Sequence, residues 1–228
     1  MNGEYPPVDP RRRRRGSLAD EVVTYVRDLI LAGSLKPGTK IDQDAVGEAL
    51  DVSRSPVREA LVILGREGLV EVTPRRGASV ARLTPDDIVD HYELFGVVAG
   101  RAAAMAAVSL KDDEIAELAA IHERFEHDTG EDLSALNNAF HRVINSAAPR
   151  RTRWLLRHLV NSVPARYYEF IEGWDAHAVQ HHAAILEAIS QRDPDSARRA
   201  MEEHLHQSGI AAAEFLQRHG YWDEEDQP

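Results

Sequence analysis

Apolar residues recur every three or four positions in three segments near the N-terminus, which is the spacing of one helical face. The segments cover residues 18–33, 43–50 and 54–67. Serines that can accept a hydrogen bond from a first helical turn precede the first and third segments, at Ser17 and Ser53. Glycine ends the same two segments. The pattern therefore predicts three short amphipathic helices.

The pattern then changes to two short runs rich in β-branched residues, at residues 69–73 and 78–82. The sequence PRRG joins them and contains the proline and glycine that are typical of turns. Three helices followed by a hairpin are the elements of a winged helix-turn-helix. We expect such a domain over residues 17–82.

Beyond Leu83 the apolar spacing is helical throughout, and prolines and glycines divide it into segments. We expect helices at residues 85–110, 111–127, 131–147, 150–171, 175–191 and 194–218, with a kink at Pro164. Short connections between helices favour an antiparallel bundle, here over residues 83–220. The predicted fold class is mainly α, with an N-terminal winged helix-turn-helix followed by an all-α antiparallel bundle.

The two ends of the chain have compositions that cannot form a core. Residues 1–16 include the run Arg11–Arg15 and predict a disordered basic tail, and residues 221–228 predict an acidic tail. Two alternatives stay open for the arginine run. It is an arm that contacts the minor groove or the phosphates of DNA, or it is a solubilising tail.

The net charge of the chain is −11, but its acidic residues are unevenly placed. Residues 1–82 hold 14 Lys and Arg against 12 Asp and Glu, whereas the remaining residues hold 13 against 26. A nucleic acid would be repelled by the C-terminal part and attracted only to the N-terminal part. There is no cysteine, so disulfides and thiolate metal ligands are excluded. No run of about 18 apolar residues occurs, and we expect a cytoplasmic protein with no membrane association.

The third predicted helix offers a face that can read DNA. Arg54, Ser55 and Arg58 lie off its apolar stripe, and the two arginines are one turn apart. Arginine can donate two hydrogen bonds to guanine or bind a phosphate, and Ser53 and Ser55 can bond to either group. Considered without the rest of the chain, these residues could also form an ordinary basic surface that is exposed to solvent.

The predicted hairpin turn offers a second contact, since Arg75, Arg76 and Gly77 can approach a groove or the phosphates. Taken alone, it is only a basic turn. The joint occurrence of three short helices, an arginine-bearing helix and a basic hairpin tip in the net-positive region predicts binding to double-stranded DNA.

Four side chains of the helical part are expected to meet. Asn137 and His141 share one face of a helix, while His182 and His204 lie on the apolar stripes of the last two helices. Residues equidistant from a turn stand level in an antiparallel hairpin, and the expected turn at Asp193 is midway between the last two histidines. His182 and His204 should therefore face each other, with the other pair approaching from a third helix.

Three neutral imidazoles and a side-chain oxygen form a ligand set for a divalent metal ion, with Zn²⁺ or Ni²⁺ favoured. Coordination positions left open could take a small bidentate carboxylate. The alternative is that each histidine is a core residue satisfied by hydrogen bonds. The remaining histidines are expected to be exposed, locally hydrogen-bonded or rotated away from these stripes: His91, His122, His127, His158, His177, His181, His206 and His219.

Three stretches, GSLKPGTKI, VSRSPVREAL and LGREGLVEVTPRRGASV, resemble the DNA-binding domain of the GntR family of bacterial transcription regulators. The resemblance implies that Arg54 and Arg58, with neighbouring hydroxyls and the wing glycine, read an operator half-site. One departure stands at 42–44, where relatives often carry a basic residue and this chain has Asp42, Gln43 and Asp44.

Residues 85–218 resemble the helical domain of the FadR-like subgroup, in its metal-containing FCD type. This implies that His141, His182 and His204 are ligands, with an aspartate in relatives where this chain has Asn137. An uncharged oxygen predicts a lower metal affinity or a vestigial site. Relatives also tend to carry an Arg and a Glu roughly where Phe95 and Ala99 stand, so the way in which this chain would anchor an acidic effector stays open.

These features predict a homodimeric, ligand-responsive transcription regulator that binds a near-palindromic operator. The family resemblance favours repression over activation, with a small carboxylate as effector. The alternative is a metal-dependent hydrolase that uses the histidine cluster, although no HExxH motif occurs. The small-residue stretch GRAAAMAA predicts close helix packing, within the bundle or at a dimer contact.

Overall fold

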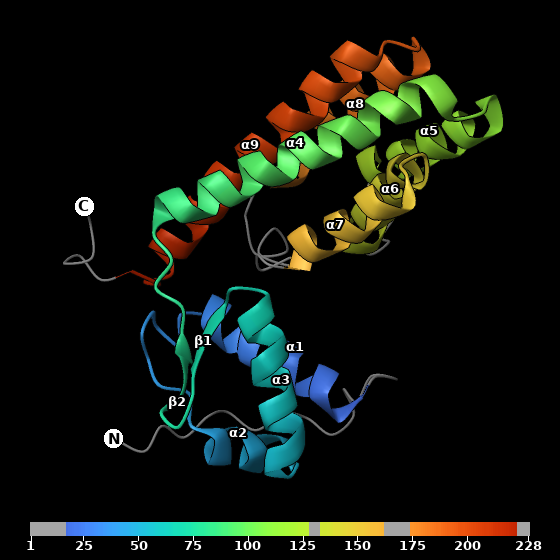
Figure 1. Cartoon of the computed structure of the whole chain (residues 1–228). Helices are drawn as coiled ribbons and strands as arrows, with labels where there is room; N and C mark the ends of the chain where they lie inside the picture. Colours follow the sequence, from blue (N-terminus) through green and yellow to red (C-terminus); the bar gives the residue numbers. More distant parts are fainter. Residues whose placement is uncertain (1–16, 128–132, 162–173, 223–228) are drawn as a thin grey trace. The chain divides into compact units, whose positions relative to one another are not determined.

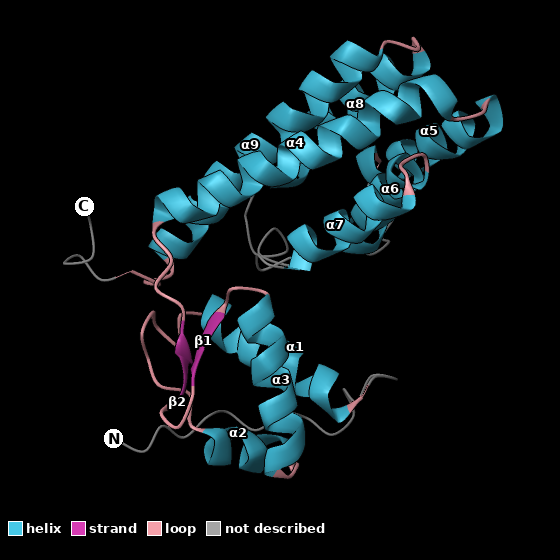
Figure 2. Ribbon diagram, in the orientation of Figure 1, coloured by secondary structure: helices cyan, strands magenta, loops and turns pink. Residues whose placement is uncertain are grey.

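The computed structural model describes residues 17–127, 133–161 and 174–222. They divide into two compact units, one formed by residues up to Thr84 together with those from Leu216 onward, and one formed between Pro85 and Phe215. Helices dominate both units, and one two-stranded sheet lies in the first (Figure 2). The predicted fold class is confirmed. No described helix has the length and apolar character needed to cross a membrane.

The first unit has the expected order of three helices and a hairpin. The elements are α1 (Leu18–Leu31), α2 (Gln43–Leu50), α3 (Arg54–Arg66), β1 (Val70–Thr73) and β2 (Gly77–Val80). Ser17 caps α1 as predicted, because its hydroxyl accepts a hydrogen bond from the Asp20 amide at 3.2 Å while the Asp20 carboxylate accepts from the Ser17 amide at 2.9 Å. Such a cap stabilises a helix by about 1 kcal/mol.

The core of the first unit lies between α1 and α3. Val22 and Val26 of α1 and Val57 and Leu64 of α3 are fully buried. Burying an aliphatic side chain of this size contributes about 1.5–3 kcal/mol. The antiparallel strands pair with Val70 opposite Val80, and residues 39–41 add hydrogen bonds to the outer edge of β2. The strands start and end slightly differently from the predicted runs, because pairing stops where the turn begins.

The second unit consists of α4 (Pro85–Ser109), α5 (Asp112–Glu126), α6 (Leu133–Ser146), α7 (Arg150–Asn161), α8 (Trp174–Ser190) and α9 (Pro194–Arg218). These helices match the six predicted segments, except that α7 is described only to Asn161. The expected kink at Pro164 lies outside the described residues.

The two 25-residue helices, α4 and α9, lie side by side (Figure 1). A Cβ atom added to Gly100 would lie 2.9 Å from Glu202 Cγ and 3.0 Å from the Arg198 carbonyl oxygen, which is closer than a side chain tolerates. Gly96 also faces the backbone of Glu202. The small residues of α4 therefore serve packing within the bundle, where they allow close approach of the two helices.

The turn that joins α8 to α9 is held by contacts of Arg192 and Asp193, and we refer to it as the clamped turn. The Asp193 carboxylate caps α9 by accepting hydrogen bonds from the amides of Asp195 and Ser196 at 3.1 and 3.0 Å. Arg192 reaches the junction of α4 and α5, where it donates to the Leu110 carbonyl oxygen and forms an ion pair with Asp112 at 2.7 Å. These contacts fix where the hairpin turns.

The C-terminal segment begins with two buried aromatic residues. Tyr221 is 3% exposed and Trp222 is 5% exposed, and the Trp222 indole N–H donates to the Leu83 carbonyl oxygen at 2.6 Å. Both residues were expected to start an acidic tail. The rest of that tail, residues 223–228, and the basic tail with Arg11–Arg15 lie outside the described residues.

Candidate functional site

The outer face of α3 is hydrophilic at its N-terminal end. Arg54, Ser55 and Arg58 are exposed, whereas Val57 and Leu61 on the opposite face are buried in the first unit. The packing of one face thus fixes which side chains the other presents. Ser53 occupies the N-cap position, but its hydroxyl makes no capping hydrogen bond, unlike that of Ser17. An uncommitted hydroxyl at this position can bond to a phosphate or a base.

Arg54 forms a bidentate ion pair with Asp44 of α2. Arg54 Nε lies 2.5 Å from Asp44 Oδ1, and Nη2 lies 2.6 Å from Oδ2. The hydrogen bond from Arg54 holds the pKa of Asp44 below its usual value, against the opposing effect of burial, and the positive charges of Arg54 and Arg58 lower it further. Both side chains are more than half exposed. The carboxylate therefore neutralises the first arginine of the predicted reading face.

The turn of the hairpin presents its arginines to solvent. Arg75 and Arg76 are exposed, and Arg75 and Gly77 have positive φ angles of 65° and 98°. A positive φ favours glycine, so Gly77 suits its position, while Arg75 adopts a conformation that side chains rarely take. Lys40 comes near this turn, since its Cε lies 3.5 Å from the position of a Cβ on Gly77.

Three histidines of the second unit come together as predicted. One ring nitrogen from each of His141, His182 and His204 lies within 4.8 Å of the others. The His182 and His204 ring centroids are 5.0 Å apart, and the ring of His141 is 5.2 Å from each. Helices α6, α8 and α9 thus each supply one imidazole.

The protein interior holds these imidazoles in the neutral form. Burial lowers the pKa of His141 to about 4. Burial lowers the pKa of His182 and of His204 well below the usual value, and the neighbouring imidazoles lower both further. Neutral imidazole is the form that coordinates a metal ion, because a ring nitrogen then carries a free lone pair. The rings therefore need to lose no proton before they bind a cation at neutral pH.

Three buried polar atoms on α6 and α8 lack a protein partner within the described part of the chain. Both ring nitrogens of His182 and Oδ1 of Asn137 are buried with no hydrogen-bond partner. An unpaired buried polar atom costs about 1–3 kcal/mol, so a native structure normally supplies a partner. Phe140 stacks on the His182 ring at 4.2 Å and 13°, which fixes the orientation of that ring.

These observations fit a divalent cation. The unpaired oxygen of Asn137 lies on the same helix as His141, one turn earlier. Metal–nitrogen bonds are about 2.0–2.1 Å long for zinc, so small side-chain rotations would bring three ring nitrogens now within 4.8 Å of one another onto one ion. Asn137, His141, His182 and His204 are the residues that would hold it.

Comparison with known families settles the class of the protein. The profile of bacterial regulatory proteins of the gntR family matches residues 18–80, and the profile of the FCD domain matches residues 90–207, which is more than half of the chain. The chain belongs to the GntR family. It is a transcription regulator with a GntR helix-turn-helix domain and an FCD domain, and not an enzyme, so the hydrolase alternative is not supported.

Proteins similar to this GntR-family chain are also named transcription regulators. The chain is 25% identical over 214 residues to the HTH-type transcriptional repressor RspR of Escherichia coli K12, covering 90% of this chain and 93% of the relative. It is 28% identical over 185 residues to an HTH-type transcriptional regulator of Mycobacterium tuberculosis, covering 79% and 75%. A solved GntR-family regulator from Pseudomonas syringae pv. tomato is 26% identical, with a TM-score of 0.52 and coverage of 93% and 90%.

One histidine of this GntR-family protein is not where the sequence placed it. His122 was expected to be exposed or locally bonded, but it is 8% exposed and its Nδ1 has no described partner. It lies on the buried face of α5 with Leu118, Ile121 and Phe125. Burial lowers its pKa, with a small opposing effect of Glu126. The helical spacing of those apolar neighbours is the signal that would have found it.

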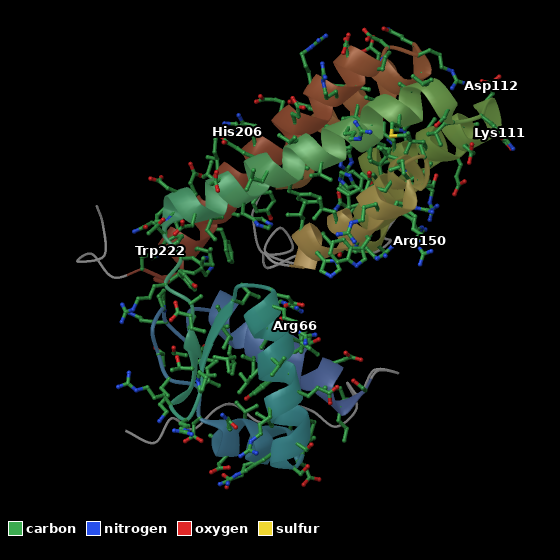
Figure 3. The ribbon with its side chains drawn as sticks, viewed as in Figure 1. Arg66, Lys111, Asp112, Arg150, His206 and Trp222 are labelled. Atoms are coloured by element: carbon green, nitrogen blue, oxygen red, sulfur yellow. The ribbon has the colours of Figure 1, made fainter. Side chains whose placement is uncertain are left out.

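The other histidines differ in their surroundings. His91 donates from Nε2 to the Leu159 carbonyl oxygen at 2.9 Å, and His158 donates from Nδ1 to the Trp154 carbonyl oxygen at 2.8 Å. His206 points away from the cluster to Glu93 at 3.0 Å (Figure 3). His181 is closer than expected, with its ring 5.8 Å from that of His204. His127 and His219 are exposed, and the side chain of His177 lies outside the described part.

Proposed function

We propose that this GntR-family regulator binds a near-palindromic operator as a homodimer and releases it when a small organic acid binds in the FCD domain. The observation that carries the DNA-binding part is the exposed arginine face of α3, opposite its buried stripe. In the proposal, α3 enters the major groove and contacts bases or phosphates through Ser53, Arg54, Ser55 and Arg58.

The wing supplies the second set of contacts in this proposal. Arg75 and Arg76 project from the turn into solvent, and Gly77 lets the backbone approach DNA. These arginines would enter the narrow minor groove or bind phosphates beside the half-site.

An exposed apolar row on α4 supports the dimer. Leu94, Val97 and Val108 share one face and are 55%, 61% and 70% exposed. Arg101 and Glu202 line a shallow hollow beside Val97. A contact around a two-fold axis brings the same surface of two copies together, so a patch that carries both charges can be complementary to itself. We therefore assign this face of α4 to the contact with a second copy.

The histidine cluster supports the effector part. A Zn²⁺ or Ni²⁺ ion held by His141, His182, His204 and the Asn137 oxygen would supply positive charge and open coordination positions to a small carboxylate. Phe140 would orient His182 by stacking, and α6, α8 and α9 would each move with the ligand they carry. An effector that prefers one arrangement of these helices shifts the population of dimer geometries and thereby operator affinity.

Repression is proposed because the related RspR is named a repressor. The proposal as a whole is tested by selecting duplexes that the protein binds from a random-sequence pool, followed by footprinting. We expect a protected near-palindrome, with an affinity that changes when Zn²⁺ or Ni²⁺ and small carboxylates are added together. Uniform coating of every duplex at moderate ionic strength would overturn the proposal.

A further inference from the structure

Asp44 lies in the stretch 42–44, where relatives often carry a basic residue, and the structure shows what its carboxylate contacts. Its two carboxylate oxygens accept hydrogen bonds from Arg54 Nε at 2.5 Å and from Arg54 Nη2 at 2.6 Å. Arg54 is the first residue of α3, and Asp44 lies in the first turn of α2. The ion pair therefore joins the two helices of the helix-turn-helix at the end of α3 that presents its side chains to solvent.

The local fold fixes the distance between these two side chains. The Asp42 carboxylate caps α2 by accepting a hydrogen bond from the Asp44 amide at 2.9 Å. The turn to α3 is tight, because the Val52 amide donates to the Gly47 carbonyl oxygen at 2.9 Å. A Cβ on Gly47 would lie 2.9 Å from the Val52 carbonyl oxygen, so this turn accepts only glycine without a shift. The carboxylate is thus held at a set position beside α3.

The pairing leaves only part of the guanidinium group available. Arginine has five N–H donors in one plane, and Asp44 occupies one donor on Nε and one on Nη2. The remaining donors include a parallel pair on Nη1 and Nη2, which can bond to the O6 and N7 acceptors of guanine. Asp44 therefore occupies the edge of the guanidinium group formed by Nε and Nη2. The edge formed by Nη1 and Nη2 stays available for a base.

The pairing also changes the attraction of Arg54 for phosphate. An unpaired arginine is attracted to any phosphate of any duplex. Beside Asp44 the positive charge is compensated, and two further carboxylates, Glu48 and Asp51, line the same hollow between the helices. A phosphate that approaches Arg54 from this side meets negative charge, whereas a base edge with two acceptors still meets two donors.

We propose that Asp44 is a specificity-determining residue that positions Arg54 for one base pair and suppresses its binding to phosphates of random sequence. This inference rests on the proposed reading of an operator by α3. It differs from a purely structural role for the ion pair, because an exposed pair contributes little to stability, and Asp44 and Arg54 are both more than half exposed.

The test compares Asp44→Asn with Glu48→Gln in the full-length protein. Both substitutions remove one negative charge from α2, but only the first releases Arg54. Duplexes selected by the wild-type protein from a random-sequence pool serve as the operator, and a scrambled duplex serves as competitor. For Asp44→Asn, we expect the operator-to-scrambled affinity ratio to fall by about tenfold, with relaxed preference at one base position. Because Glu48→Gln leaves the pair of Asp44 with Arg54 intact, it should lower this affinity ratio much less than Asp44→Asn does.

A second comparison separates this mechanism from a general charge effect. In an Arg54→Ala background, Asp44→Asn should leave the affinity ratio unchanged, because no arginine is left to release. Asp44→Asn should also steepen the salt dependence for scrambled DNA by roughly one phosphate contact. An unchanged ratio in Asp44→Asn, with thermal melting like that of the wild type, would overturn the inference. Absence of any preferred sequence for the wild-type protein would overturn the proposed function itself.

Discussion

The imidazole rings of His182 and His204 lie 5.0 Å apart although they belong to different helices. Both side chains are buried, and burial together with the neighbouring imidazoles lowers the pKa of each. Both ring nitrogens of His182 are buried without a hydrogen-bond partner in the described part of the chain, which is costly unless a ligand pairs with them. The pair is therefore the centre of the proposed metal site.

The metal content of the protein tests this site directly. Protein purified without chelators and without a metal-affinity column should contain close to one equivalent of Zn²⁺ or Ni²⁺ by elemental analysis. His182→Ala should lose the metal, whereas His158→Ala, which changes an exposed histidine on α7, should retain it. A content below about a tenth of an equivalent that does not respond to His182→Ala would contradict the site.

Asn137 should limit the affinity of the site. Asn137→Asp places a negative oxygen at the buried position, so we expect metal affinity to rise by at least tenfold, which is about 1.4 kcal/mol. In the metal-free protein the same carboxylate would be buried without a partner, and the free energy of unfolding should fall. Asn138→Asp adds the same charge at the neighbouring exposed position, so it should change neither the metal affinity nor the free energy of unfolding. Competition with a fluorescent zinc indicator and urea unfolding measure the two effects.

Acid should destabilise the metal-free protein through the same histidines. The pKa of His141 falls from 6.5 in a model peptide to about 4 in the folded protein because of burial. Between these values the unfolded chain binds more protons than the folded protein, so the free energy of unfolding decreases as the pH falls through this range. Above the unfolded pKa this contribution is constant.

Urea unfolding of chelator-treated protein over this pH range measures the effect. His141→Gln removes one titrating group and should flatten the decrease. Equal slopes in wild type and His141→Gln would show that His141 is not the group that resists protonation.

On the DNA side, Arg58→Ala should weaken operator binding by about 1–3 kcal/mol and relax one base preference. Arg58 is exposed near the start of α3, whereas Arg66 lies at the other end of the same helix (Figure 3). Arg66→Ala should therefore have a much smaller effect. Electrophoretic mobility shifts with selected and scrambled duplexes compare the two variants. An equal loss of operator affinity in Arg58→Ala and Arg66→Ala would show that Arg58 does not read the operator.

The apolar row on α4 predicts the outcome of a charge substitution. Val97→Asp places a carboxylate in a side chain position that is 61% exposed, so the folded monomer should tolerate it. At a two-fold contact the new carboxylate of one copy would lie close to that of the other copy. The repulsion between two buried negative charges should separate the dimer. Sedimentation velocity measures the change from dimer to monomer. Ala120→Asp, at an exposed position of α5, should stay dimeric.

Much of the architecture follows from the spacing of apolar residues. The bounds of α2, α3 and α9 match the predicted segments within a residue, because capping residues and prolines mark their ends in the chain. The approach of His182 and His204 followed from their equal distance from one turn. The spacing of residues in the sequence is sufficient to predict a contact when the two elements that make it follow each other in the chain.

The features that the sequence did not reveal depend on contacts between elements. The pairing of Asp44 with Arg54 crosses a turn, and neither residue belongs to an apolar pattern. Trp222 is buried and donates a hydrogen bond to Leu83, which lies far from it in sequence. His122 was missed for a different reason, because the prediction relied on histidines with a partner at ligand spacing and passed over its place on the apolar face of α5.

The clamped turn at Arg192 and Asp193 restricts how this sequence can evolve. One inserted residue between His182 and the turn would rotate His182 about 100° around its helix, away from the other imidazoles, because Arg192 anchors the loop to Leu110 and Asp112. Insertions and deletions should therefore be rare in this hairpin among homologues that keep the ligands, even where point substitutions are frequent.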